Sequence, residues 1–204
     1  MTKTNSNSGR HFFQFWPTAL FILCLLLFYF CQTKMDLSYQ RELVEGGQWW
    51  RLLSGQLVHN NSAHLFSNIV ALILCRVLFL AVLSERAFVV SILLCSLITG
   101  GLIYFLLQHY DYYLGVSAAL YGVLVAGSLH LIVGRHYWGG VLLLVVMAKL
   151  LRDYFYPAVL VSVSDRIGVP VAVEAHFIGV LAGVLLAVGQ CIVILIRPAT
   201  LPPK

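Results

Sequence analysis

Residues 87–107 read AFVVSILLCSLITGGLIYFLL, a run of 21 residues without a charged side chain. A helix needs about 20 mostly apolar residues to cross the hydrocarbon core of a bilayer, so this stretch predicts a transmembrane helix. The whole chain has the same character, because 60% of its residues are hydrophobic and only 10% are charged. An ordinary soluble domain has about 25% charged residues. The composition therefore excludes a soluble globular protein, a disordered chain and a nucleic-acid binder.

Five further apolar runs flank this segment, which gives six candidate spans in 204 residues. In chain order, the six runs cover residues 13–30, 63–82, 87–107, 116–133, 138–150 and 171–196. The length fits a single domain, and the pattern predicts an all-α bundle of six transmembrane helices over residues 1–204. Lys3 and Arg10 precede the first run as they would in a signal peptide. No small-residue cleavage site follows that run, so we expect an uncleaved span.

The charges beside the spans favour an orientation with both termini in the cytoplasm. An even number of spans puts both termini on one side of the membrane and the two long connections, residues 31–62 and 151–170, on the other. The Lys and Arg residues next to spans at the termini and in the short loops mark the inner side by the positive-inside rule. We expect an integral protein of the bacterial inner membrane with a short cytoplasmic tail at residues 1–12. The net charge of +5 fits contact with anionic lipid.

Polar side chains from three distant parts of the chain fall at one predicted depth, near the outer ends of their spans. His59, His64 and Asn68 lie at the start of the second span, Ser117 at the start of the fourth, and His176 near the start of the sixth. Polar groups are costly within a span, so their meeting at one depth indicates a functional site. His64 and Asn68 are four residues apart and therefore share one face of a helix.

Small residues indicate how these helices approach one another. Gly179 and Gly183 follow His176 at GxxxG spacing, which allows a second helix to pack closely on the sixth span. Gly122 comes five residues after Ser117 and is the kind of small residue that the partner helix needs. Such a contact would bring the histidine close to a side chain of the facing helix.

A serine and a histidine placed together can carry out nucleophilic catalysis. A serine hydroxyl is a weak nucleophile until a base removes its proton, and histidine is the natural base near neutral pH. The amide of Asn68, the ring of His64 and the backbone N–H of Ser117 are candidate donors to the oxyanion that this reaction forms. Glu174 precedes His176 by two residues and so points to a different face of the helix. We therefore expect a Ser–His dyad and not a triad.

Four ordered motifs resemble those of the rhomboid intramembrane serine proteases. They are Trp50-Arg51 in the first long loop, the histidines and the asparagine at the start of the second span, GVSAALYG at residues 115–122, and HFIGVLAG at residues 176–183. The family patterns are WR, a spaced H…H…N, GxSGxxYG and HxxGxxxG. The resemblance covers residues 48–190, which it marks as the catalytic core. It implies a protease of membrane-anchored proteins that cuts near the outer face of their transmembrane segment and needs no cofactor or metal.

The resemblance also implies a role for each matched residue. Ser117 would be the nucleophile and His176 the general base. His64, Asn68 and the Ser117 amide would form the oxyanion site, and Tyr121 would stack on His176. The remaining motif residues would be structural: Trp50, Arg51, His59, Gly115, Gly179 and Gly183. One position departs from the family, because Ala118 stands where a glycine usually follows the serine.

Two further stretches resemble the rhombosortases, which are bacterial relatives of the rhomboids. They are KLLR at residues 149–152 and GVPVAVEAH at residues 168–176. This resemblance implies surface proteins with a Gly-Gly-containing C-terminal tail as substrates. The serine motif fits the general rhomboids about as well.

Two other functions stay open on the residues alone. A haem- or quinone-linked membrane protein would use His64 and His176 as ligands, and it predicts a Soret absorbance and no role for Ser117. A transporter or proton path would need intramembrane carboxylates or broken helices at the midplane, whereas the polar cluster lies near one face.

A zinc protease is disfavoured because the sequence contains no HExxH motif. The five cysteines lack metal-ligand spacing and are expected to be core residues.

The remaining intramembrane polar residues are expected to be structural. His109, His130 and His136 lie in loops or at the opposite end of their span, and we assign them to packing or solvent. Arg76 lies deep in the second span, and its long side chain is expected to snorkel toward the inner face.

Overall fold

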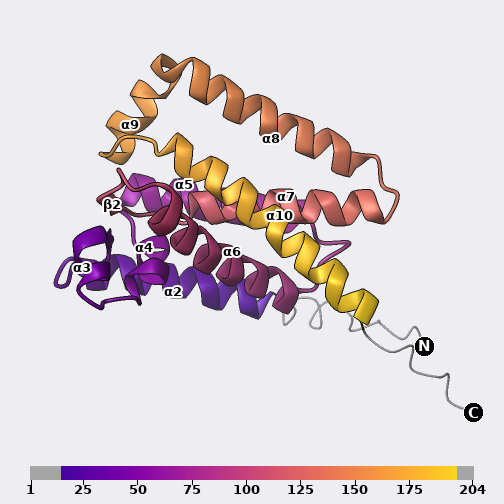
Figure 1. Ribbon diagram of the computed structural model, residues 1–204, viewed down its shortest axis with the longest axis horizontal. Helices are drawn as coiled ribbons and strands as arrows, with labels where there is room; N and C mark the ends of the chain where they lie inside the picture. Colours follow the sequence, from indigo (N-terminus) through magenta and orange to yellow (C-terminus); the bar gives the residue numbers. More distant parts are fainter. Residues whose placement is uncertain (1–14, 197–204) are drawn as a thin grey trace, which may run out of the picture.

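The structure is a computed structural model that describes residues 15–196, and these form a helical bundle with one short strand pair. Six long helices run through it (Figure 1): α2 (Trp16–Gln32), α5 (Ser62–Leu78), α6 (Glu85–Leu106), α7 (Ser117–Val133), α8 (Trp138–Phe155) and α10 (Val173–Ile196). Each coincides with one of the six apolar runs, so the predicted helical architecture is confirmed. The largest difference is in α8, which continues five residues past the end of its run. The predicted tail at residues 1–12 lies outside the described residues.

Two of the helices, α6 and α10, are long and apolar enough to cross a membrane. The helix α4 (Arg51–Leu57) and α5 pass the same test when they are taken as one span, although the chain bends by 91° between them. Both α2 and α7 are apolar but have only 17 residues. That length corresponds to about 26 Å, against a hydrocarbon core of about 30 Å. The apolar helices thus identify an integral membrane protein, while the count of six spans stays a prediction.

Side-chain caps fix where α5 and α6 begin. The Oδ1 atom of Asn61 accepts a hydrogen bond of 2.8 Å from the N–H of His64, which satisfies a free donor of the first turn. The Oγ atom of Ser84 accepts one of 3.2 Å from the N–H of Ala87 in the same way. Because α5 begins at this cap, His64 and Asn68 lie in its first two turns, beside the long connections.

The helix α7 lies inside the bundle and packs against α5, α6, α8 and α10 (Figure 1). Its residues Ala119, Leu120 and Val123 are buried in an apolar core together with Leu72 of α5 and Ile92 of α6. Large apolar side chains outside this core are exposed on the surface of the bundle. Examples from four helices are Leu74, Leu97, Leu144 and Leu185. An apolar surface of this kind is stable in contact with lipid.

The connection between α2 and α5 is folded and is held against the rest of the bundle. It contains β1 (Tyr39–Gln40), α3 (Arg41–Glu45) and α4. The strand β1 pairs antiparallel with β2 (Tyr112–Tyr113), and the N–H of Gly115 donates to the carbonyl of Gly55 at 2.9 Å. A Cβ at Gly100 would lie only 2.0 Å from the carbonyl oxygen of Leu52, so α4 packs tightly on α6. These contacts fix the segment that leads into α7.

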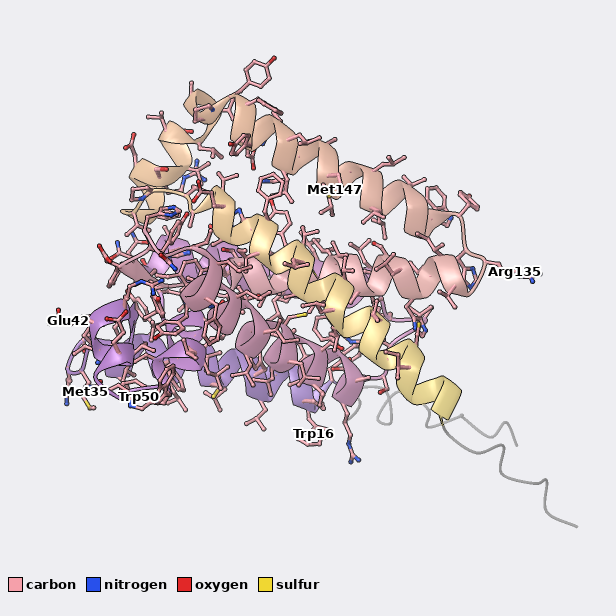
Figure 2. All side chains as sticks on the ribbon, in the orientation of Figure 1. Trp16, Met35, Glu42, Trp50, Arg135 and Met147 are labelled. Atoms are coloured by element: carbon pink, nitrogen blue, oxygen red, sulfur yellow. The ribbon has the colours of Figure 1, made fainter. Side chains whose placement is uncertain are left out.

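The bundle has two distinct ends. The elements α3, β2 and α9 (Val161–Ile167) lie at one end, and the 3₁₀ helix η1 (Pro157–Leu160) leads from α8 into α9 (Figure 1). The turn between α7 and α8 lies at the other end, where Arg135 is far from Trp50 and Met35 (Figure 2). We call the end with α3, β2 and α9 the loop end, because both long connections lie there.

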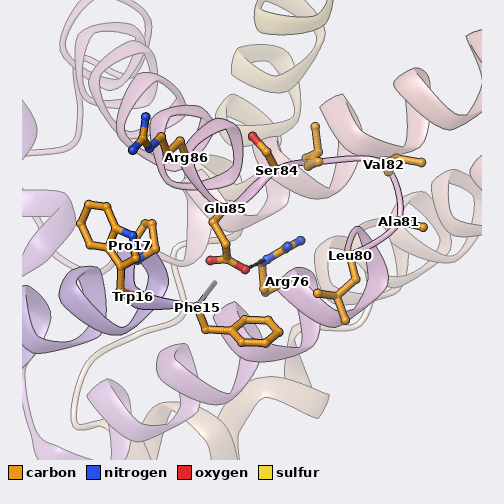
Figure 3. Close-up of a pocket in the computed structure, with 11 residues that line it drawn as sticks. Phe15, Trp16, Pro17, Arg76, Leu80, Ala81, Val82, Ser84, Glu85 and Arg86 are labelled. Carbon is orange, nitrogen blue, oxygen red and sulfur yellow. Dashed lines mark hydrogen bonds and ion pairs between the residues drawn. The ribbon is translucent and has the colours of Figure 1, made fainter. Parts of the chain in front are cut away.

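Arg76 is buried in an ion pair at the end opposite the loop end. Its Nε donates to Oε1 of Glu85, and Oε2 of Glu85 accepts a hydrogen bond of 2.5 Å from the hydroxyl of Thr18. Figure 3 shows the arginine and the glutamate in contact with each other at the wall of a cavity of about 540 Å³ that both residues line. Arg76 is only 7% exposed, and its predicted snorkelling toward the inner face stays a prediction. Its charge is compensated within the protein, and the pair joins α2, α5 and α6.

Candidate active site

Ser117 is the first residue of α7 and follows a tight turn at Gly115. This glycine has a φ of +109°, a conformation that side-chain-bearing residues rarely adopt. The Oγ atom of Ser117 lies 3.0 Å from Nε2 of His176 on α10, within hydrogen-bonding distance. The histidine is buried, whereas the serine is partly exposed. The structure thus brings together the serine and the histidine that the sequence singled out.

Two glycines of α10 explain why these side chains meet. A Cβ at Gly179 would lie 1.9 Å from the carbonyl oxygen of Ala118, and a Cβ at Gly183 would lie 2.2 Å from that of Gly122. Ordinary van der Waals contact begins at about 3.4 Å. Any larger residue at either position would therefore push α10 away from α7. His176 lies one turn before the first of these contacts, which sets its ring beside Ser117.

An aromatic ring and not a carboxylate supports His176. The ring of Tyr121 lies 4.6 Å from the imidazole, at an interplanar angle of 33°. The Nδ1 atom of His176 is buried and has no hydrogen-bond partner among residues 15–196. The carboxylate of Glu174 instead contacts Nε2 of His109 at 2.6 Å. The arrangement is therefore a serine–histidine pair without a third, acidic member in the described part of the chain.

Two side chains of α5 reach the turn that precedes Ser117. A Cβ at Gly115 would lie 2.8 Å from Nε2 of His64 and 3.6 Å from Nδ2 of Asn68. The Nδ2 atom of Asn68 is buried and makes no hydrogen bond within the part of the chain that the structure describes. A buried amide donor without a partner is costly, unless a ligand or a reaction intermediate supplies the acceptor. The amide therefore has the chemistry of an oxyanion donor beside the serine.

Tyr113 takes part in this site, and the sequence reasoning missed it. Its hydroxyl donates a hydrogen bond of 2.9 Å to the carbonyl oxygen of Gly115. Complete burial raises the pKa of the Tyr113 phenol, so the hydroxyl stays protonated and can donate at any physiological pH. The bond fixes the orientation of the peptide that leads to Ser117. In the sequence, the only signal for this role is the Tyr112–Tyr113 pair in the short connection before Ser117. Two adjacent tyrosines do not by themselves indicate a hydrogen bond to the turn.

Three of the predicted structural residues, Trp50, Arg51 and His59, lie outside the serine–histidine contact. Arg51 is buried, and its Nη1 donates to the carbonyl of Ser38 at 2.6 Å, while its guanidinium lies 4.6 Å from the centre of the Trp50 ring. These contacts hold the folded connection between α2 and α5. His59 is also buried and meets the ring of His64 edge-to-face at 5.0 Å. It packs against His64 and lines neither cavity beside Ser117.

A cavity of about 370 Å³ opens beside the serine–histidine pair. Its lining includes Ser117, His176, His64, Asn68 and Tyr121, together with residues of α8, of α9 and of the segment before α10. A second cavity of about 320 Å³ adjoins the same serine between α5, α7 and α8 and is almost wholly apolar. Within residues 15–196, no group of three or more His, Cys, Asp or Glu side chains could hold a metal ion.

The family model for the rhomboid domain matches residues 46–192 of this chain. The chain belongs to the rhomboid family. A comparison with curated proteins finds no match. The rhomboid family is known for intramembrane serine proteases that act on membrane-anchored proteins, so membership supports a protease function. The matched range contains every residue of the site described above.

Ala118 departs from the usual rhomboid motif without entering the cavities. It is fully buried in an apolar cluster with Tyr113, Ala175 and Ile178, and it lines neither cavity beside Ser117. The methyl group of this rhomboid therefore does not narrow the space in which a substrate backbone would lie. Its carbonyl oxygen, which contacts Gly179, is the part of the residue that affects the site.

Proposed function

We propose that the protein is an intramembrane serine endopeptidase in which Ser117 and His176 form a catalytic dyad. In this mechanism, Oγ of Ser117 attacks the carbonyl carbon of the scissile peptide bond while Nε2 of His176 takes its proton. The histidine then returns the proton to the leaving amine, and water hydrolyses the acyl-enzyme. The observation that carries the proposal is the 3.0 Å contact between Oγ and Nε2. The same contact argues against the use of His176 as a haem ligand.

His64, Asn68 and the backbone N–H of Ser117 are the proposed oxyanion donors. Each lies at or beside the Gly115 turn, and the Asn68 amide has no competing acceptor among the described residues. Donors held in place before the reaction stabilise the developing charge without a reorganisation cost. Tyr121 is proposed to hold the imidazole in the orientation that faces the serine.

The proposed substrate is a membrane-anchored protein that is cut near the outer face of its transmembrane segment. The site lies at the loop end of the bundle, which we assign to the outer side, with both termini cytoplasmic and six spans in a bacterial inner membrane. A helix must unwind locally to expose its backbone for cleavage, so small or helix-breaking residues are expected at the cut site. Within the family we propose the rhombosortase type, with Gly-Gly-containing C-terminal tails as substrates. The motifs at residues 149–152 and 168–176 support this assignment.

A fluorophosphonate probe on the purified protein tests the proposal, because it reacts with serines that a base activates. The wild-type protein should be labelled at Ser117, and Ser117→Ala and His176→Ala should abolish both labelling and turnover. The control is Ser128→Ala, which changes a buried serine of the same helix that lines neither cavity. This control should be labelled like the wild type. Labelling that persists in Ser117→Ala would remove that residue from the mechanism.

A further inference from the structure

The cavity beside Ser117 carries a net positive charge. Lys149 and Arg152 of α8 line it, and no carboxylate of the described chain does. Both cations contact Asp153: Nζ of Lys149 lies 2.6 Å from Oδ2, and Nη2 of Arg152 lies 2.6 Å from Oδ1. The side chain of Asp153 is 0% exposed, whereas the two cations are 50% and 55% exposed. One buried carboxylate cannot neutralise both, so one net positive charge faces the cavity.

These cations keep hydrogen-bond donors for a ligand. An ammonium group has three N–H donors and a guanidinium has five. The bonds to Asp153 engage one donor of Lys149 and the Nε and Nη2 atoms of Arg152. Apart from the hydroxyl of Tyr121 beside Lys149, the remaining donors have no further hydrogen-bond partner among the described residues. The buried carboxylate therefore holds the two cations in place while they can bind a second anion.

Lys149 and Arg152 lie close enough to Ser117 for one bound substrate peptide to contact all three residues. Nζ of Lys149 lies 5.6 Å from the centre of the Tyr121 ring, and that ring lies 4.6 Å from the ring of His176, which contacts Ser117. An extended chain covers about 3.3–3.6 Å per residue. A residue bound at the cations is therefore only a few positions away from the peptide bond at the serine.

Neighbouring elements do not supply a competing anion. Glu174, at the start of α10, contacts His109 and does not line this cavity. Asp165 and Arg166 lie on α9, which forms part of the wall, but both side chains are outside the lining. His64 and His176 line the cavity without adding a negative charge.

We propose that Lys149 and Arg152 form a subsite for a carboxylate of the substrate. The protein would then prefer substrates that carry an Asp or Glu side chain a few residues from the cleaved bond. The inference rests on the protease function proposed above and specifies its substrate class. Asp153 acts as a positioning residue, because it holds both cations at the cavity wall. A charge-assisted hydrogen bond is stronger than a neutral one, which gives the subsite its selectivity for an acid over an amide.

Paired peptides test this subsite. Internally quenched fluorogenic peptides that differ only by Glu or Gln at one position are scanned along both sides of the cleaved bond, with the protein in detergent micelles. We expect the kcat/KM ratio of Glu to Gln to reach about tenfold at one or two positions and to fall as salt is added. Equal rates for Glu and Gln at every position would overturn the inference.

Two variants and a control separate charge recognition from structural damage. The combined variant Lys149→Gln, Arg152→Gln and Asp153→Asn removes both cations without leaving an unpaired carboxylate, and its ratio should fall to about one. Asp153→Asn alone leaves both cations but removes the carboxylate that holds them at the cavity wall, so its ratio should fall below that of the wild type without reaching one. Arg166→Gln removes an exposed cation outside the cavity and should leave the ratio unchanged. A tenfold ratio that persists in the combined variant would refute the subsite.

Fluorophosphonate labelling of the same preparations distinguishes failure of the subsite from failure of the protease proposal. Wild-type protein that is labelled at Ser117 and cleaves the peptides without acid preference refutes only the subsite. Wild-type protein that is neither labelled nor active refutes the proposed function and the subsite with it. A labelled combined variant with a ratio near one supports the subsite, because damage to the dyad would lower both rates equally.

Discussion

The substitution Gly179→Ala tests whether the contact between α7 and α10 determines catalysis. The added Cβ would lie 1.9 Å from the carbonyl oxygen of Ala118, and it must move by about 1.5 Å to reach ordinary contact at 3.4 Å. Both atoms belong to helix backbones or are attached directly to them, so the helices themselves must separate. A similar shift at His176 would lengthen its 3.0 Å contact with Ser117 beyond the range of a hydrogen bond.

The expected effect on activity is large. A misplacement of about 1 Å at a reacting group costs roughly 100-fold in rate, so kcat should fall by at least that factor. Overpacking of this kind also destabilises a protein by about 1–3 kcal/mol. The assays are steady-state cleavage of a fluorogenic peptide, the rate of fluorophosphonate labelling, and thermal unfolding in the same detergent.

The matched control is Gly189→Ala on the same helix. A Cβ at this position meets nothing within 4 Å, so the substitution adds the same methyl group without a clash. Alanine favours a helix over glycine by about 1 kcal/mol, so stability should rise or stay the same while activity is kept. A folded Gly179→Ala variant that is labelled and cleaves at the wild-type rate would refute the view that this contact sets the geometry of the dyad.

Three further substitutions test other parts of the structure. Asn68→Ala should lower kcat by roughly 10²–10³-fold with little change in KM, because the amide acts on the oxyanion; an effect on KM alone would contradict this role. Tyr113→Phe removes the donor to the Gly115 carbonyl and should lower kcat/KM by up to about tenfold, since one neutral hydrogen bond contributes about 0.5–1.5 kcal/mol. Arg76→Gln leaves Glu85 buried and unpaired and should destabilise the fold by about 3–5 kcal/mol in denaturant unfolding. Replacement of both partners by methionine should recover most of this loss, and an equally unstable double variant would argue against the charge explanation.

The positions of the helices could be predicted because long hydrophobic runs mark them in the sequence. The exact ends of the helices depend on polar interactions as well. The apolar run of α8 stops near Leu150, where charged residues begin, but the helix continues to Phe155. Asp153 explains the difference, because it accepts hydrogen bonds from Lys149, four residues earlier, and from its neighbour Arg152. Local ion pairing lets charged residues extend a helix that apolar content alone would end.

The serine–histidine pair was predictable because each residue lies in a motif with its own spacing. Other features depended on contacts between distant segments. The bond from Tyr113 to the Gly115 carbonyl requires the tight turn before α7, which sequence spacing does not reveal. The ion pair of Arg76 with Glu85 crosses the turn between α5 and α6, and its burial depends on Thr18 of α2. An arginine in an apolar run predicts a cost of burial, but it does not identify the partner that offsets this cost.

In the proposed mechanism, the residues that carry out the reaction and the residues that select the substrate lie on different helices. The proposed nucleophile and base lie on α7 and α10, which the glycine contacts hold at one separation, and the proposed oxyanion donors reach the same turn from α5. The cations that face the cavity lie on α8, where Nζ of Lys149 lies 5.6 Å from the centre of the Tyr121 ring that packs on His176. Substitutions on α10 should therefore lower the rates of all substrates together, whereas charge changes on α8 should alter the ratio between substrates.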